Sequence, residues 1–370
     1  MGRAITMSTN PLLDAAEDPV TVVMPEFPWD VVLASSDGVA AALADASRAI
    51  GRLEGARERV SPWHQCAYAL ASLEGWACVL AAGRKVSWRA VDRAFADSTL
   101  AYRRGATDAE TAARLIGFHS GLDGYADRFR STGIVASELS AGEFVSPRFQ
   151  STLERGLDTW LVEGPGSGLV RSILAMMSIA ASMPESERVA MAARSIFPWL
   201  VVTSRASETM IPISAGFVGF AGDWDLISRA LNDPDGYDPD TVNRAVELSL
   251  RAVERAASAA SYEVMSLGSR HRRDPIAIFL SGTIPSVRYI FYLLNALPCA
   301  TREQLLALTS LSLRTVNKAV RILEGEGAVV VDGQVRGRQD YVVRCSPPWR
   351  PSPHAAQYYQ SVSAEPLGQR

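Results

Sequence analysis

The stretch Thr301–Val343, TREQLLALTSLSLRTVNKAVRILEGEGAVVVDGQVRGRQDYVV, decides the fold expected for the C-terminal part of the chain. Thr301 and Gln304 have the spacing of a capping box, in which each side chain can bond the backbone amide of the other. This pattern predicts a short helix that begins here and runs through Leu308. A tight turn and then Ser312, a favoured N-cap residue, predict another helix over 313–325.

Apolar residues at helical spacing can hold these two short helices at the angle of a helix-turn-helix. They are Leu305, Leu308, Leu311, Val316, Ala319, Val320 and Leu323. A further helix is expected before them, over 285–297. After them the apolar period changes to that of strands, at 328–331 and 341–343, and the loop between these strands carries Arg336 and Arg338.

Three helices followed by a hairpin with a basic tip resemble the bacterial winged helix-turn-helix regulators over roughly 60 residues. The resemblance implies that helix 313–325 reads duplex DNA while the hairpin, the wing, contacts it with its arginines. The residues expected to contact DNA are Ser312, Arg314, Thr315, Asn317, Lys318, Arg321, Arg336 and Arg338. Some winged helices only dimerise or bind protein, which is one alternative. Another is that Arg314 and Lys318 belong to a solvated face of the helix.

The charge distribution favours a partner with phosphate groups for the C-terminal part. Residues 270–350 contain twelve Arg or Lys and six Asp or Glu, a net charge of +6. Because the whole chain carries -3, the remainder carries -9. A basic module on an acidic body is the asymmetry expected when one domain meets nucleic acid.

The residues before 270 predict a body made of helices. Strand-like alternation is nearly absent there, and apolar residues recur at three- and four-residue spacing. Thr107 and Glu110 form a second capping box, and Asp240 is expected to cap a long alanine-rich helix. Gly55 and the charged residues 57–59 are expected to end the first helix. The expected helices are 37–55, 62–82, 87–95, 107–127, 149–162, 169–182, 185–202, 224–231 and 240–267. A charged hinge is expected at 269–275.

The body resembles Fic-domain proteins without their catalytic motif. Pro25–Gly55, PEFPWDVVLASSDGVAAALADASRAIGRLEG, is similar to the N-terminal region of that family, in which a Pro-rich entry precedes a helix. Glu74 and Gly75 match the end of the family's inhibitory motif, although Leu70 occupies its hydroxyl position. The catalytic His-Pro-Phe-x-x-Gly-Asn-Gly-Arg is matched only by FPWLVVTSR at 197–205, where Phe197 replaces the general base.

This Pro-Trp-Leu form is similar to an uncharacterised, often plasmid-borne bacterial family that joins a Fic-like body to a helix-turn-helix. The resemblance implies a body that has lost catalysis and serves dimerisation, sensing or partner binding. Two alternatives stay open: a divergent Fic-like nucleotidyl or phosphoryl transferase that uses a cleft near 196–215, and a plasmid-maintenance protein whose winged helix binds protein.

The fold class expected is therefore mainly α, a Fic-like helical bundle followed by a small α+β winged-helix domain. The expected parts are a tail at 1–20, the body at 21–269, the winged helix at 276–345 and a tail at 346–370. The function expected is that of a DNA-binding transcriptional regulator. Its expected partners are double-stranded DNA and a second copy of the chain, with an effector of unknown identity.

Several other classes of protein are disfavoured by what the sequence lacks. No secretory signal and no apolar run of membrane-spanning length is visible, which predicts a cytoplasmic protein. Cys66, Cys78, Cys299 and Cys345 are scattered and predict reduced thiols rather than a metal site or disulfides. We expect no cofactor, no metal and no catalytic residue. The four histidines are expected to serve packing or surface roles.

Overall fold

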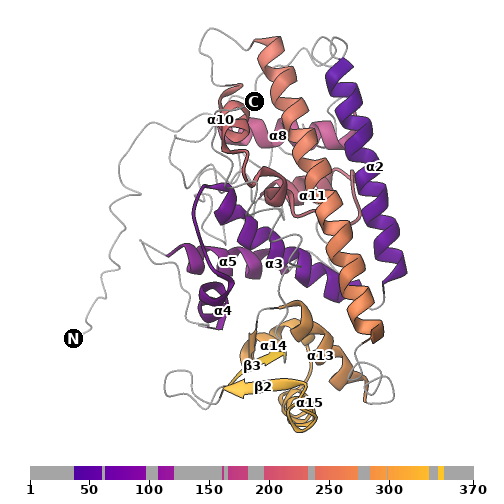
Figure 1. Ribbon diagram of the computed structural model, residues 1–370, viewed down its shortest axis with the longest axis vertical. Helices are drawn as coiled ribbons and strands as arrows, with labels where there is room; N and C mark the ends of the chain where they lie inside the picture. The colour runs from indigo at the N-terminus through magenta and orange to yellow at the C-terminus, as the bar shows by residue number, and fades with distance from the viewer. Residues whose placement is uncertain are drawn as a thin grey trace, which may run out of the picture.

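The protein is described from a computed structural model that is mainly helical, with a small sheet near the C-terminus (Figure 1). The described residues are 37–60, 63–96, 107–120, 161, 166–181, 196–231, 238–273, 284–297, 299–332 and 341–345. Outside them lie the two expected tails, the Pro-rich entry and the expected helix over 149–162, except for Leu161. Residues 121–127 and 185–195 of two further expected helices also lie outside them.

Helices make up all the regular structure described before Ala300, which confirms the all-helical body for these residues. They are α2 (Asp37–Arg59), α3 (Trp63–Ala81), α4 (Trp88–Ala96), α5 (Asp108–Ser120), α8 (Gly168–Ala181), the short 3-10 helix η2 (Ile213–Phe217), α10 (Ala221–Arg229) and α11 (Pro239–Arg273). Residues 196–203 are also helical. The C-terminal elements are α13 (Pro285–Ala296), β1 (Ala300–Thr301), α14 (Arg302–Thr309), α15 (Leu313–Gly325), β2 (Val329–Asp332) and β3 (Val342–Cys345).

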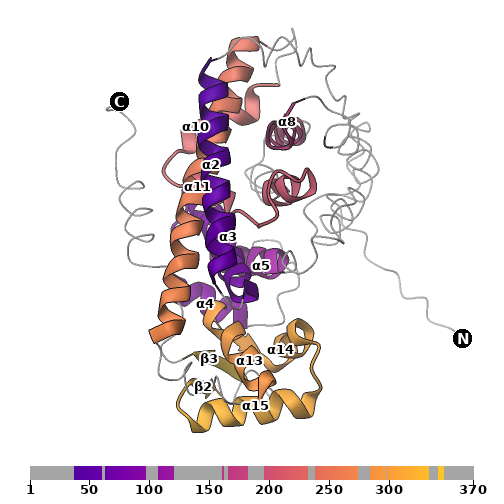
Figure 2. The same ribbon diagram turned by 90° about the vertical axis from the view of Figure 1, so that its right-hand side faces the viewer.

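The two longest of the described helices, α2 and α11, lie side by side along one flank of the molecule (Figure 2). Their C-terminal ends lie together, since a Cβ atom at Gly268 would come within 2.7 Å of the Val60 side chain. The buried faces of both helices are rich in alanine, whose short side chain lets helix axes approach closely. The remaining body helices pack behind this pair.

Both helices run further than their sequences predict. The helix α2, expected over 37–55 with Gly55 and residues 57–59 ending it, continues through these residues to Arg59. Burial of Ala56 and Val60 outweighs the cost of about 1 kcal/mol for a helical glycine. The helix α11 does not end near Leu267, since residues 269–273 of the expected hinge are helical. Arginine is a good helix former, and basic residues stabilise a helix C-terminus.

The cap of α11 is Asp238 rather than the expected Asp240. One carboxylate oxygen of Asp238 accepts from the Thr241 amide at 3.0 Å and also from the Thr241 hydroxyl. Pro239 then takes the first helical position, where its missing N–H costs nothing. The sequence prediction placed the cap two residues too late because it overlooked this preference of proline.

Asp238→Ala is expected to lower the melting temperature at pH 7 more than Asp240→Ala does. The hydrogen bonds from Thr241 hold the pKa of Asp238 below its usual value of 3.8. A lowered carboxyl pKa stabilises the folded state above pH 3.8, and this contribution is lost as the pH falls through the folded pKa. Thermal melts of both variants between pH 7 and pH 3 should show the Asp238 difference shrinking in acid. Equal effects of the two substitutions would contradict the assignment of the cap.

The second expected cap, at the start of α5, is confirmed. Glu110 donates its amide to the Thr107 hydroxyl at 3.2 Å, and its carboxylate accepts from the Thr107 amide at 2.7 Å. The helix then packs closely against α3, because a Cβ atom at Gly75 would lie 2.6 Å from the Ile116 amide nitrogen. His119 near the end of α5 is fully buried, and this burial lowers its pKa to about 3. It therefore has a packing role in its neutral form.

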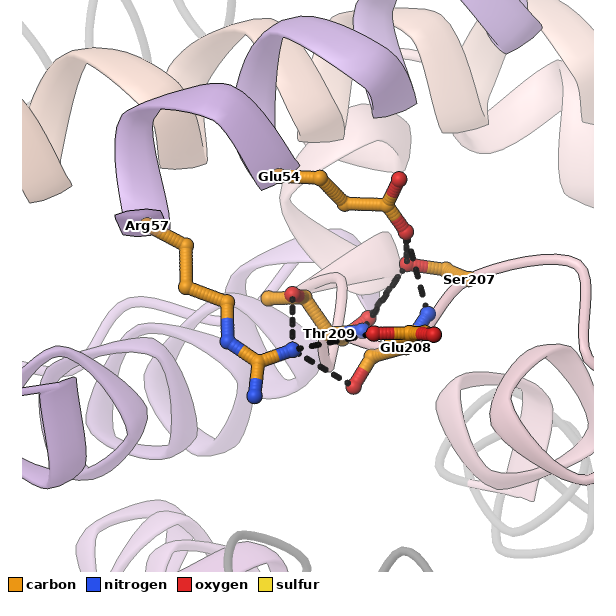
Figure 3. A network of polar contacts seen from close by, with 5 residues as sticks. All are labelled: Glu54, Arg57, Ser207, Glu208 and Thr209. Carbon is orange, nitrogen blue, oxygen red and sulfur yellow. Dashed lines mark hydrogen bonds and ion pairs between the residues drawn. The ribbon is translucent and has the colours of Figure 1, made fainter. Parts of the chain in front are cut away.

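The chain between the helix 196–203 and η2 is tied to α2 by a polar network (Figure 3). The carboxylate of Glu54 accepts from the Glu208 amide at 3.0 Å and from the Ser207 hydroxyl at 3.3 Å. The guanidinium of Arg57, one turn later, donates to the Glu208 carbonyl and the Thr209 hydroxyl, both at 3.4 Å. The end of α2 thus fixes the segment that leads into η2.

A three-stranded antiparallel sheet with the order β1-β3-β2 closes the C-terminal module. Val329 pairs with Cys345 and Asp332 with Val342 in the hairpin, while Ala300 pairs with Val343 at the other edge. The expected hairpin strands are confirmed within one or two residues. The two-residue strand β1 was not predicted, since it is too short to show alternation.

The C-terminal module packs directly on the body through α13, which lies against α3. Tyr289 of α13 is hydrogen-bonded to Tyr68 of α3, and the buried residues of both parts belong to one continuous hydrophobic cluster. Gln304 adds a polar tie. Its carbonyl oxygen accepts from the Thr301 amide at 2.8 Å to complete the capping box, and its amide nitrogen donates to the Phe95 carbonyl of α4 at 3.0 Å.

Gln304→Glu is expected to break this tie while keeping the cap. A carboxylate can still accept from the Thr301 amide but cannot donate to the Phe95 carbonyl. Loss of one partly buried hydrogen bond should lower the free energy of unfolding by about 1–2 kcal/mol. Hydrogen exchange measured by mass spectrometry should become faster over 300–309. Glu303→Gln changes the charge by one unit in the opposite direction at the exposed neighbouring position and should leave the exchange as it is. Equal exchange in parent and Gln304→Glu would show that the tie carries no energy.

Candidate nucleic-acid interface

The local sequence fixes α15 against α14 through a turn and a cap. Ser310, at the end of α14, has the left-handed φ of 53°, and its amide donates to the Leu306 carbonyl at 3.0 Å. Ser312 is the N-cap of α15, because its hydroxyl accepts from the Thr315 amide at 3.2 Å. The start at Leu313 and the end at Gly325 confirm the bounds predicted for this helix.

The basic residues of α15 form one ridge, defined here as Arg314, Lys318 and Arg321. Successive residues of an α-helix are about 100° apart, so these three lie within an arc of about 60°. All three are exposed. The arc lies opposite the buried stripe of the helix, which consists of Val316, Ala319, Val320 and Leu323.

The helix that carries the ridge lies at one end of the molecule. Both views place α15 at the end of the molecule remote from α8 and α10 (Figures 1 and 2). Among the described residues, none of the three ridge cations forms an ion pair. Exposed carboxylates stand at the other end of the helix, on Glu324 and Glu326. The N-terminal two-thirds of α15 therefore carries positive charge and its C-terminal end negative charge.

Three of the expected DNA contacts also make bonds within the chain. The hydroxyls of Ser312 and Thr315 lie 2.8 Å apart and share a hydrogen bond in addition to the cap. The amide oxygen of Asn317 accepts from the Tyr341 hydroxyl at 2.6 Å. The Asn317 bond links α15 to the start of β3, a role that the sequence did not predict because the partner lies 24 residues away.

The two wing arginines, Arg336 and Arg338, lie outside the described residues. The strands on either side of them are paired as expected, and Arg344 on β3 forms an ion pair with Asp332 on β2 at 3.3 Å. The sheet therefore holds both ends of the wing loop beside α15. Arg344 has its own carboxylate partner, which distinguishes it from the cations of the ridge.

The first half of the segment expected to match the altered Fic motif lies in the core, while Arg205 at its end is exposed. Phe197 is fully buried, so an apolar side chain stands where that motif needs a base. Trp199, which takes the place of the motif's phenylalanine, is 2% exposed. Glu74, which matches the family's inhibitory glutamate, is also fully buried. Its carboxylate accepts from the Ser214 amide at 2.9 Å and from the Ser214 hydroxyl at 2.6 Å, and so anchors η2 to α3.

The four cysteines are buried, and none of them forms a disulfide. In the described ranges, no group of His, Cys, Asp or Glu is arranged to hold a metal ion. None of the described helices combines the length and the apolar content needed to cross a bilayer. No model of a known protein family matches the chain, and no curated protein matches it either.

Proposed function

We propose that the chain is a DNA-binding transcriptional regulator that reads duplex DNA through α15. The C-terminal elements follow one another as helix, strand, helix, helix, strand, strand, and the last two strands form a hairpin beside the final helix. This succession is the one that a winged helix-turn-helix requires. On this proposal α15 enters the major groove, and the loop between β2 and β3 contacts the flanking backbone.

The observation that carries the proposal is the unpaired basic ridge. A helix that only packs a domain has no need of three cations on one outer arc, and like charges there cost free energy unless a counterion or partner neutralises them. DNA supplies such a partner, with one phosphate charge for every 1.7 Å or so of helix axis. Arginine and lysine can also donate to guanine in the major groove.

On this proposal the body holds the C-terminal module in place and has no catalytic role of its own. Helix α13 and the Gln304 bond fix the module on α3 and α4, so the orientation of α15 depends on the body. We propose that the body also joins two copies of the chain, since winged helices commonly bind two half-sites as dimers. We propose that the protein acts in the cytoplasm of a bacterium. The proposal does not specify the identity of an effector.

The direct test is a gel shift with the full chain and the duplex found upstream of its own gene. At about 0.15 M salt we expect retardation at nanomolar protein and at least about a hundredfold weaker binding to a scrambled duplex of the same composition. Labelled ATP incubated with the protein checks the transferase alternative in the same preparation. Retardation of neither duplex at micromolar protein would overturn the proposal.

A further inference from the structure

Leu313 has an exposed position that the packing of the module does not explain. Five large apolar side chains of the described residues are exposed: Tyr262, Met265, Ile284, Leu313 and Val330. Leu313 is the first residue of α15, directly before the ridge residue Arg314, and it is 48% exposed. The buried stripe of the helix is complete without it.

The charges along α15 show which end of the helix suits a duplex. Phosphates attract Arg314 and Lys318 in the first two turns and repel Glu324 and Glu326 at the last turn. The partial positive charge of a helix N-terminus acts in the same direction. The end of α15 that begins with Leu313 is therefore the end that approaches DNA most closely.

Two of the four side chains at positions 312–315 take part in hydrogen bonds at the helix cap. The hydroxyls of Ser312 and Thr315 share a hydrogen bond, and the Ser312 hydroxyl also accepts from the Thr315 amide. Leu313 and Arg314 remain, one apolar and one a donor. In the major groove the one apolar feature that distinguishes the bases is the 5-methyl group of thymine.

We infer that Leu313 contacts the 5-methyl group of a thymine and thereby sets one base of the sequence that the protein prefers. This inference rests on the proposed function and adds to it a base and the atom that is read. The contact would bury a side chain that otherwise stays half in water, which favours the complex over the separate molecules.

The test replaces thymine with deoxyuridine, which lacks only the methyl group. Duplexes are first selected from a random pool by the full chain, and each thymine of the selected site is then replaced in turn. Fluorescence anisotropy should show about fivefold weaker binding of the parent at one position, the size expected for one methyl-sized apolar contact. Leu313→Ala should bind the thymine and deoxyuridine duplexes equally well at that position.

Val330→Ala serves as the matched control, since it removes another exposed apolar side chain of the same module. This variant should keep the fivefold preference for thymine. Thermal melts check that both variants are folded. A selected duplex whose thymines can all be replaced without effect, or a preference that persists in Leu313→Ala, would overturn the inference and leave the proposed function standing. Failure to select any duplex would overturn both.

Discussion

Replacing Arg314 and Lys318 together with alanine is expected to weaken binding to the preferred duplex by about 50-fold at 0.15 M salt. The two side chains are exposed on the ridge, and no carboxylate of the described residues is paired with them. Each is expected to contribute one charge-assisted contact, and loss of two such contacts should cost about 2–3 kcal/mol of binding free energy. Alanine favours the helix, so α15 should remain folded.

The dependence of the affinity on salt separates this explanation from a general loss of charge. Each phosphate contact adds about 0.9 to the magnitude of the slope of log K against log salt, so the double variant should have a slope shallower by about 2. Arg52→Ala with Arg59→Ala removes the same charge from exposed positions of α2 and should change neither the slope nor the preference between duplexes. If the ridge variant binds like this control, another surface of the chain meets the DNA.

Gly216→Ala is expected to give the largest loss of stability. A Cβ atom at this position would lie 1.9 Å from the Ala252 carbonyl oxygen. That oxygen belongs to the backbone of α11, so η2 and the helix must move apart. The movement would also strain the 2.9 Å hydrogen bond from the Arg255 guanidinium to the Gly216 carbonyl. We expect the free energy of unfolding to fall by about 3 kcal/mol or more.

Gly51→Ala is the matched control because the same methyl group is added to a site with nothing within 4 Å. Alanine is the better helix former and leaves the unfolded chain less freedom, so this variant should gain about 0.5–1 kcal/mol. Urea denaturation of both variants, followed by circular dichroism, gives the comparison. A Gly216→Ala protein as stable as the parent would show that η2 does not lie against α11 as described.

The parts of the fold that were predictable from sequence are those governed by neighbouring residues. The capping box at Thr301 and the cap at Ser312 depend on side chains three positions away, and both are confirmed. The ridge of α15 was predictable for the same reason, since a helix with known bounds places its exposed face by its period alone.

The features that escaped prediction depend on contacts distant in sequence. The strand β1 exists because Ala300 finds Val343 as a partner, and no pattern within two residues can reveal that. The Gln304 bond to Phe95 joins residues 209 positions apart. The extension of α2 past Gly55 likewise follows from burial of Ala56 and Val60. Tertiary packing outweighs local propensity at such places.

The residues of the candidate site show the same difference between features set by neighbouring residues and features set by distant contacts. Sequence reasoning identified Arg314, Lys318 and Arg321, whose exposure is confirmed, and it also assigned Asn317 to the DNA. The bond from Tyr341 gives Asn317 a structural role that only the fold reveals. Leu313 was missed because an apolar residue at a helix start is ordinarily counted with the core. The contribution of Arg336 and Arg338 stays a prediction.

The central claim is that α15 touches DNA, and photocrosslinking tests it most directly. The full chain is bound to a selected duplex with bromodeoxyuridine in place of thymine, irradiated and digested, and the crosslinked peptides are identified by mass spectrometry. The proposal predicts crosslinks within residues 312–325. Crosslinks confined to the body helices, between residues 37 and 273, would contradict it.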